Sequence, residues 1–138
     1  MKIQQTSLYN PTFQYHSKLM DAYKNGTLKL AKGFYGGKLT PKNASHEHII
    51  PHSKGGKDRM SNYVLATKQL NQARDTIPFR NFVKVEPLLE YLDAILNSDC
   101  VEFDTLQYVK DIIKTMLRAL REGKWWLNGL KRKYLNQL

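Results

Sequence analysis

Glu47 and His48 are adjacent, and two asparagines follow them at fixed distances. Asn62 follows His48 by 14 residues, and Asn71 follows Asn62 by nine. A neutral imidazole can take a proton from water near pH 7, and carboxylate and amide oxygens are ligands that Mg²⁺ prefers. These groups could together hydrolyse a phosphate diester, which needs a base for the attacking water and a cation for the charge on the phosphate.

The residues around these positions resemble the signature of the HNH endonuclease family. Residues 47–56 read Glu-His-Ile-Ile-Pro-His-Ser-Lys-Gly-Gly, residues 62–65 read Asn-Tyr-Val-Leu, and residues 71–74 read Asn-Gln-Ala-Arg. The resemblance covers roughly a quarter of the chain and is specific in both residue type and spacing. The offsets are similar to those in the HNH domain of the RNA-guided CRISPR nucleases.

The resemblance implies a role for each residue. His48 would be the general base, Glu47 and Asn71 would hold Mg²⁺ or Mn²⁺, and Asn62 would hold the loop and orient the histidine. Arg74, one helical turn after Asn71, could place its guanidinium on the scissile phosphate, and a solvated cation at a helix end is nearly as good an explanation. Glu47 has one methylene more than the commoner aspartate, which leaves open a role away from the metal.

Two other histidines near the motif have simpler explanations. His46 alternates with His48 along a strand and should share its face. It could be a further ligand, but we expect an exposed strand residue. His52 follows Pro51, and we expect it to be a loop residue.

Many HNH proteins hold this small fold together with a zinc ion bound by two Cys-x-x-Cys pairs. The corresponding turns here are residues 33–38, which have glycines at the ligand positions, and residues 67–70. Neither contains cysteine, and thiolates are what a structural zinc site favours. We therefore expect no structural zinc, and a fold stabilised by helices packed on the motif.

The motif needs two strands and a helix to position it. Residues 45–51 predict a short strand ending at a proline, and residues 63–66 predict a second strand after a polar, glycine-containing loop. Thr67 can cap a helix that runs to Arg74. Helical spacing of apolar residues, with Pro, Asp and Gly at the ends, predicts further helices, over 10–26, 87–96, 104–123 and 126–134.

These elements predict an α+β protein that is mostly helical, with a small ββα-metal HNH motif packed against N-terminal and C-terminal helices. We see no internal repeat, so residues 1–138 should form a single nuclease domain. Its motif core would lie at about 33–80 and its C-terminal helical part at about 84–138.

The charge predicts a polyanionic partner. Lysine and arginine number 22 against 12 aspartates and glutamates, a net charge of +10, and such an excess favours phosphate binding over a merely basic surface. We expect the substrate to be double-stranded or branched DNA. Two groups of cations are expected to bind its backbone: Lys54, Lys57 and Arg59 near the motif, and Lys131, Arg132 and Lys133 near the C-terminus.

Other features restrict the setting. There is one cysteine, Cys100, so a disulfide-stabilised secreted scaffold is excluded. The sequence has no apolar run long enough to cross a bilayer and no secretory signal. We expect an intracellular, cytoplasmic protein that does not contact membranes. Stand-alone HNH proteins are frequent in phages and mobile elements, so a phage-encoded protein in a bacterial host is expected by analogy.

The main hypothesis is a metal-dependent HNH endonuclease that hydrolyses phosphodiester bonds in DNA. The alternative is a catalytically silent nucleic-acid-binding or inhibitor module that keeps the HNH frame. A third hypothesis is an interaction module whose C-terminal amphipathic helices bind a protein partner or form a homodimer.

Overall fold

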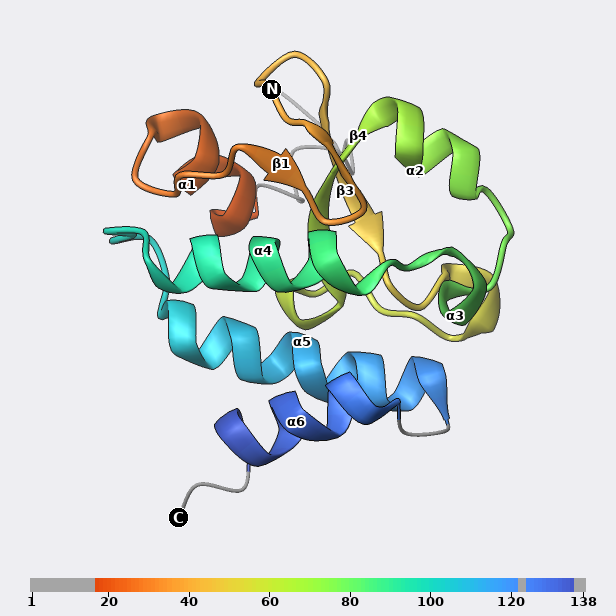
Figure 1. Ribbon diagram of the computed structural model, residues 1–138. Helices are drawn as coiled ribbons and strands as arrows, with labels where there is room; N and C mark the ends of the chain where they lie inside the picture. Colours follow the sequence, from red (N-terminus) through yellow and green to blue (C-terminus); the bar gives the residue numbers. More distant parts are fainter. Residues whose placement is uncertain (1–16, 122–123, 136–138) are drawn as a thin grey trace, which may run out of the picture.

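The computed structural model describes residues 17–121 and 124–135 (Figure 1). Two antiparallel pairs of strands lie on one side of a layer of helices. The strands are β1 Lys32–Gly33, β2 Gly36–Lys38, β3 Ala44–His48 and β4 Tyr63–Thr67. The α-helices of the described residues are α1 Lys18–Asn25, α2 Lys68–Arg74, α3 Phe79–Phe82, α4 Val85–Leu96, α5 Thr105–Leu120 and α6 Trp125–Tyr134. One-turn 3₁₀ helices lie at η2 His52–Lys54 and η3 Met60–Asn62.

The predicted strand–loop–strand–helix unit is present. Strands β3 and β4 pair along their full length, with Glu47 opposite Val64 and His48 opposite Tyr63. Strand β4 is buried throughout, as its run of aromatic and aliphatic residues requires. Helix α2 begins directly after it because the Thr67 side chain accepts a hydrogen bond from the Leu70 backbone N–H at 3.2 Å.

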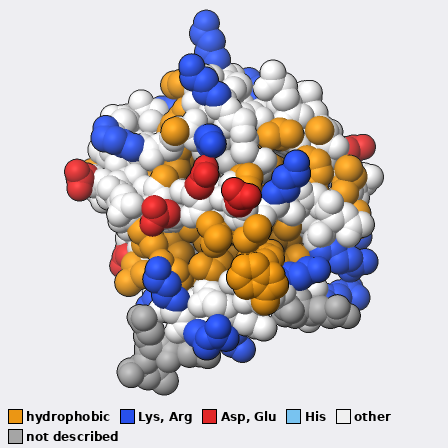
Figure 2. Space-filling view, in the orientation of Figure 1, with side chains coloured by type: hydrophobic (Ala, Val, Ile, Leu, Met, Phe, Trp, Pro, Cys, Tyr) orange, Lys and Arg blue, Asp and Glu red, His pale blue; other side chains and the backbone are white. Residues whose placement is uncertain are grey.

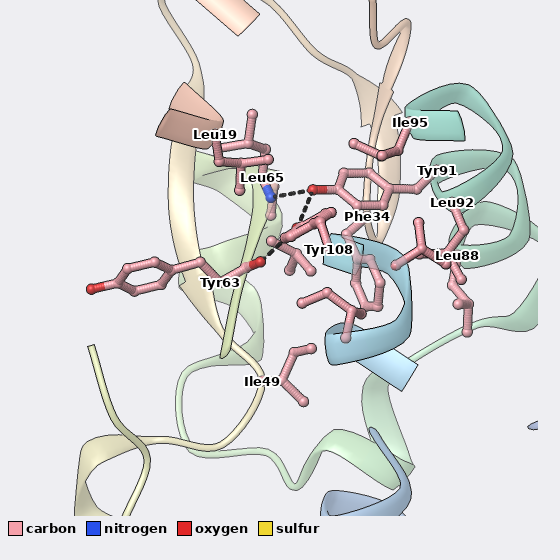
Figure 3. Packing of buried hydrophobic residues seen from close by; sticks show 14 of the residues in the cluster. Leu19, Phe34, Ile49, Tyr63, Leu65, Leu88, Tyr91, Leu92, Ile95 and Tyr108 are labelled. Carbon is pink, nitrogen blue, oxygen red and sulfur yellow. Dashed lines mark hydrogen bonds between the residues drawn. The ribbon is translucent and has the colours of Figure 1, made fainter. Parts of the chain in front are cut away.

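Two buried tyrosines connect the C-terminal helices to β4 (Figure 3). The Leu65 backbone N–H donates to the Tyr91 hydroxyl at 3.1 Å, and the Tyr108 hydroxyl donates to the Tyr63 carbonyl at 2.6 Å. The two hydroxyls are 3.0 Å apart. Burial raises the pKa of Tyr91 to about 12, so this hydroxyl stays protonated. Helices α4 and α5 are thereby fixed to the strand pair that carries the site.

Helix boundaries differ slightly from those predicted. Helix α1 is capped by Ser17 and ends at Gly26, whose φ of 85° lies in the left-handed region that glycine favours. The earlier part of the predicted N-terminal helix, including Phe13 and His16, lies outside the described residues, as does Gly123. Helix α4 begins at Val85, two residues before the expected Pro87, and the proline sits in its first turn, where no N–H is needed.

The fold class is α+β, as the sequence predicted: a small ββα motif among helices. In the part of the chain that the structure describes, no helix combines the length and apolar character that a membrane span needs.

Candidate active site

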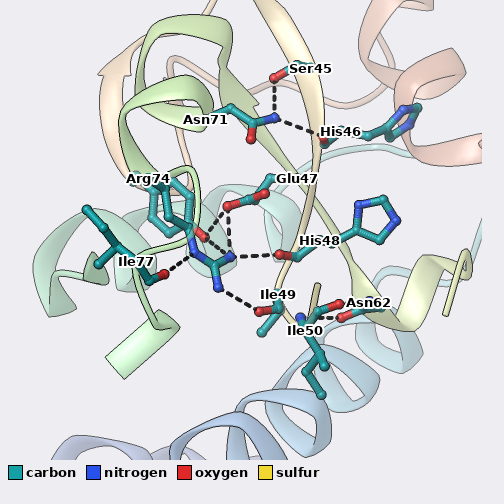
Figure 4. Close-up of polar contacts among 11 residues, drawn as sticks. Ser45, His46, Glu47, His48, Ile49, Ile50, Asn62, Asn71, Arg74 and Ile77 are labelled. Atoms are coloured by element: carbon teal, nitrogen blue, oxygen red, sulfur yellow. Dashed lines mark hydrogen bonds and ion pairs between the residues drawn. The ribbon is translucent and has the colours of Figure 1, made fainter. Parts of the chain in front are cut away.

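Adjacent residues of β3 point to opposite sides of the strand (Figure 4). Glu47 faces helix α2 and is buried, with 6% of its surface exposed. His48 and His46 face the other way, and both of their rings contact the Tyr63 ring at 4.9 Å between centroids. The prediction that His46 and His48 share a face is therefore confirmed.

Glu47 is paired with Arg74 inside the protein. The Arg74 Nη1 atom lies 2.9 Å from Glu47 Oε2, and the Tyr35 hydroxyl donates to the same oxygen at 2.7 Å. Arg74 is itself only 2% exposed. Burial, and next the Glu47 charge, raise the pKa of Tyr35, so this phenol stays a donor. The Glu47 charge is thus balanced by a cation at hydrogen-bond distance.

Arg74 also holds the chain on both sides of the motif. Its guanidinium donates to the carbonyls of Ile77 at 3.0 Å, His48 at 2.8 Å and Ile49 at 3.2 Å. The solvated-cation explanation for Arg74 is therefore wrong. Its donors already have protein acceptors, and the guanidinium connects the end of β3 to the segment after α2.

Asn71 lies on the same side of β3 as Glu47. Its Nδ2 atom donates to Ser45 Oγ and to the His46 carbonyl, each at 3.0 Å, which leaves its Oδ1 atom without a hydrogen bond to a described residue. The hydrogen bonds of Glu47 likewise use Oε2 and leave Oε1. Figure 4 shows the Asn71 oxygen directed toward the Glu47 carboxylate. The structure therefore brings these two predicted ligands together, on the side of β3 away from the His48 ring.

Asn62 is buried and closes the loop between the strands. Its Oδ1 accepts the Ile50 backbone N–H at 2.9 Å, and its Nδ2 donates to the Ile50 carbonyl at 2.9 Å and the Lys57 carbonyl at 3.1 Å. The loop passes so close that a Cβ at Gly56 would lie 1.6 Å from the Ile50 carbonyl oxygen. This is the arrangement that the loop-holding role of Asn62 requires.

His48 lies in a polar cluster at the end of β3. Its Nε2 atom is 2.7 Å from Asp58 Oδ1, and His52 Nε2 is 2.6 Å from the same oxygen. The Tyr63 hydroxyl also reaches this oxygen, at 3.1 Å. About a third of the His48 side chain is exposed, at 29%, against 62% for His52. The imidazole is therefore both held by a carboxylate and open to solvent.

Sequence reasoning missed Asp58 and Tyr35, and treated His52 as an ordinary loop residue. A signal for Asp58 does exist, because it is the only acidic residue between His48 and Arg74. Tyr35 carries no comparable signal, since its partner Glu47 lies in a different strand pair.

His46 is half-buried, not exposed as expected. Its Nε2 atom lies 2.5 Å from the hydroxyl of Ser17, the residue that caps helix α1. Burial, and next the neighbouring His48, lower the pKa of His46. Its contacts are with α1 and with the Tyr63 ring.

Of the predicted phosphate-binding cations, Lys54, Lys57 and Arg59 are exposed on the loop that carries His52 and Asp58. Residues 131–133 lie on α6, which Figure 1 shows on the far side of α5 from β3. The structure therefore brings the first group, and not the second, close to His48.

Two sets of donor atoms could hold a cation. Glu47 and Asn71 supply oxygens, which suit Mg²⁺ or Mn²⁺ with water and phosphate completing the coordination. The second set is His48, His52 and Asp58, whose ligand atoms all lie within 4.8 Å of one another. Its two imidazoles favour a transition metal over Mg²⁺.

The two turns that the resemblance would pair with zinc-binding turns lie side by side here. A Cβ at Gly33 would be 3.1 Å from the Thr67 backbone nitrogen, and one at Gly37 would be 3.4 Å from Leu70 Cδ1. Close packing therefore joins these turns. The expected absence of a structural zinc stays a prediction.

Residues 36–77 match the model of a protein family described as HNH endonuclease. The matched segment contains β2, β3, β4 and α2 with all of the motif residues, and it confirms the resemblance to this family for residues 36–77. Nuclease activity in general, on nucleic acid and with a divalent metal, is what this family indicates. No curated protein and no solved structure matches the chain.

Proposed function

Because residues 36–77 belong to the HNH endonuclease family, we propose that this protein is a metal-dependent endonuclease that hydrolyses phosphodiester bonds in DNA. The observation that carries the proposal is the His48–Asp58 pair, with 2.7 Å between nitrogen and oxygen and a partly exposed imidazole. A base for water needs both a partner that orients it and access to the substrate.

His48 is the general base of this proposal. When its Nε2–H donates to the Asp58 carboxylate, Nδ1 carries no proton and can accept one from the attacking water. The imidazolium that results is stabilised by the Asp58 charge. His52 and Tyr63 hold the same carboxylate oxygen, which restricts its rotation.

Glu47 and Asn71 would hold the divalent cation, Mg²⁺ or Mn²⁺, through the two oxygens that lack hydrogen bonds to described residues. When bound, such a cation neutralises the charge that develops on the phosphate and leaving oxygen. Arg74 and Tyr35 keep the Glu47 carboxylate in place. In this role Arg74 acts on the phosphate only through Glu47 and is a positioning residue.

The second candidate is a catalytically silent module that binds nucleic acid or inhibits a nuclease. Two observations favour it: Arg74 already balances the Glu47 charge, which lowers the attraction for a cation, and the His48 ring lies on the opposite side of β3 from Glu47 and Asn71. Under this candidate the loop cations bind DNA and no bond is broken.

A plasmid assay separates the two candidates. Supercoiled plasmid would be incubated with the protein and Mg²⁺, Mn²⁺ or a chelator, alongside His48→Ala. The endonuclease proposal expects metal-dependent nicking that His48→Ala abolishes while DNA binding is retained. Nicking that is the same in His48→Ala would remove His48 as the base. No nicking by the wild-type protein with either metal would favour the silent module.

The prediction of a protein partner or homodimer through the C-terminal helices has its own support. Leu89 on α4 and Trp125 on α6 are exposed, by 38% and 81%, and apolar side chains gather over this part of the surface in Figure 2. Sedimentation at several concentrations tests whether the chain associates with itself.

A further inference from the structure

A hollow of about 330 Å³ lies beside the candidate site, where three separate parts of the chain meet. The end of β3 and the following loop form one wall, the segment from Arg74 to Arg80 forms the second, and the last turn of α5 forms the third. Figure 4 shows Ile49, Ile50 and Ile77 near Arg74, with α5 passing beneath them.

Within the part of the chain that the structure describes, the charged side chains that line this hollow are cations. Lys54, Arg80, Arg118 and Arg121 line it, are exposed, and form no ion pair with a described residue. No aspartate or glutamate is among the described residues that line it. Arg74 also lines the hollow, but Glu47 balances its charge. Figure 2 shows Lys and Arg side chains gathered on this side, where α3 and the end of α5 lie in Figure 1.

The remaining lining is mostly apolar. Ile49, Ile77, Pro78, Phe79 and Ala119 contribute to it, and Ile77 is 40% exposed. A phosphodiester strand presents anionic oxygens next to the weakly polar faces of its sugars and bases. A cationic rim around an apolar floor is complementary to such a strand.

We propose that this hollow binds the backbone of the nucleic acid strand next to the bond that is cut, with Arg80 and Arg118, from two of its walls, contacting its phosphate. The inference deepens the proposed function and relies on its nucleic-acid substrate. Arg80, Arg118 and Arg121 all lie outside residues 36–77, so this contact surface is formed with parts of the chain that the family match does not include.

The dipole of helix α5 explains only some of the cations around the hollow. Cations in the last turn of a helix interact favourably with its dipole, which accounts for Arg118 and Arg121 at the end of α5. It does not account for Lys54 and Arg80, which come from two other segments and line the same hollow. An anion located between the three walls would interact with all four.

Binding of a fluorescent DNA duplex, measured by anisotropy in chelator over a range of salt concentrations, tests the proposal without any cleavage. The variants are Arg80→Gln and Arg118→Gln, with Arg80→Lys and Arg118→Lys as charge-retaining partners. Lys29→Gln is the matched control, because Lys29 is exposed and is not among the residues that line the hollow. Thermal unfolding of each variant checks that its fold is unchanged.

We expect each Gln variant to raise Kd by about fivefold to tenfold at moderate salt and to reduce the slope of log K against log salt by about 1, as for one lost phosphate contact. The double Gln variant should reduce the slope by about 2. The Lys variants should retain most of the slope, and Lys29→Gln should change Kd by less than about twofold.

Gln variants that bind the duplex like Lys29→Gln, with unchanged salt dependence, would overturn the proposal. So would variants that bind DNA normally but lose affinity for polyglutamate, because the hollow would then suit an acidic protein. This result is independent of catalysis. If the protein never nicks plasmid but needs Arg80 and Arg118 to bind DNA, the proposed hydrolysis is refuted and the proposed binding site is supported. If the protein nicks plasmid but binds DNA equally well without these arginines, the endonuclease proposal is supported and the binding site is refuted.

Discussion

The two faces of β3 hold similar polar groups in opposite environments. On the α2 side, Glu47 is buried against Arg74, and the pair is closed by Tyr35. On the other side, His48 shares an aspartate oxygen with His52 and keeps part of its ring in solvent. Polar residues of one strand can therefore lie buried in an ion pair on one face and partly exposed to solvent on the other, depending on what packs against each face.

The largest effect should come from breaking the buried pair. Arg74→Ala leaves the Glu47 carboxylate buried without its cation, and we expect the free energy of unfolding to fall by about 3–5 kcal/mol. Urea denaturation at pH 7 measures this. Arg80→Ala removes an exposed arginine as a control and should change stability by less than about 0.5 kcal/mol. Equal effects of the two variants would show that the pair does not stabilise the fold.

Removing the side chain of Asn62, which closes the loop between β3 and β4, should have the next largest effect. Asn62→Ala loses three hydrogen bonds between the buried Asn62 side chain and backbone groups of the loop, and we expect about 2–3 kcal/mol of destabilisation. The control is Asn81→Ala, since this exposed side chain makes no hydrogen bond to a described residue. Hydrogen exchange should speed up at the Ile50 amide in Asn62→Ala. An unchanged exchange rate there would contradict the role of Asn62 in holding the loop.

On the exposed face, the effect should be on activity and not on stability. Asp58→Asn removes the charge that orients His48, and we expect nicking of plasmid to slow by about 10–100-fold. The melting temperature should change little because the cluster is partly exposed to solvent. Full activity in Asp58→Asn would mean that His48 does not need this partner, and would weaken the proposed role of the His48–Asp58 pair as the base.

The smallest effect concerns His46, which lies on the His48 face of β3 next to helix α1. Its lowered pKa means that the unfolded chain binds more protons than the folded protein just below pH 6.5. Above pH 6.5 the titration of His46 should therefore leave the free energy of unfolding unchanged. Below pH 6.5 the free energy of unfolding should decrease as the pH falls. Burial is the largest cause of the lowered pKa of His46, and the neighbouring charges that also shift this pKa are those of His48, Asp21 and Lys24. His46→Gln should flatten the dependence of the melting temperature on pH between 7 and about 5; an unchanged profile would argue against this contribution.

The sequence predicted the motif well because its determinants are local. The alternation in β3, the aliphatic run of β4 and the threonine cap of α2 each depend on neighbours a few residues away. The same locality explains the error at His46. Strand alternation places it on the right face, but only the position of α1 decides that Ser17 covers it.

What the sequence determined by itself is which chemical groups are present and in what order: a histidine, two side chains with oxygen donors, and a basic chain around them. Only the tertiary structure decided their environments. Glu47 and Arg74 are 27 residues apart and meet because α2 folds back on β3. Likewise, the cations of the hollow come from three segments that approach one another once α4 and α5 are fixed to β4. Such distant contacts depend on burial and chain topology, which short-range spacing does not encode.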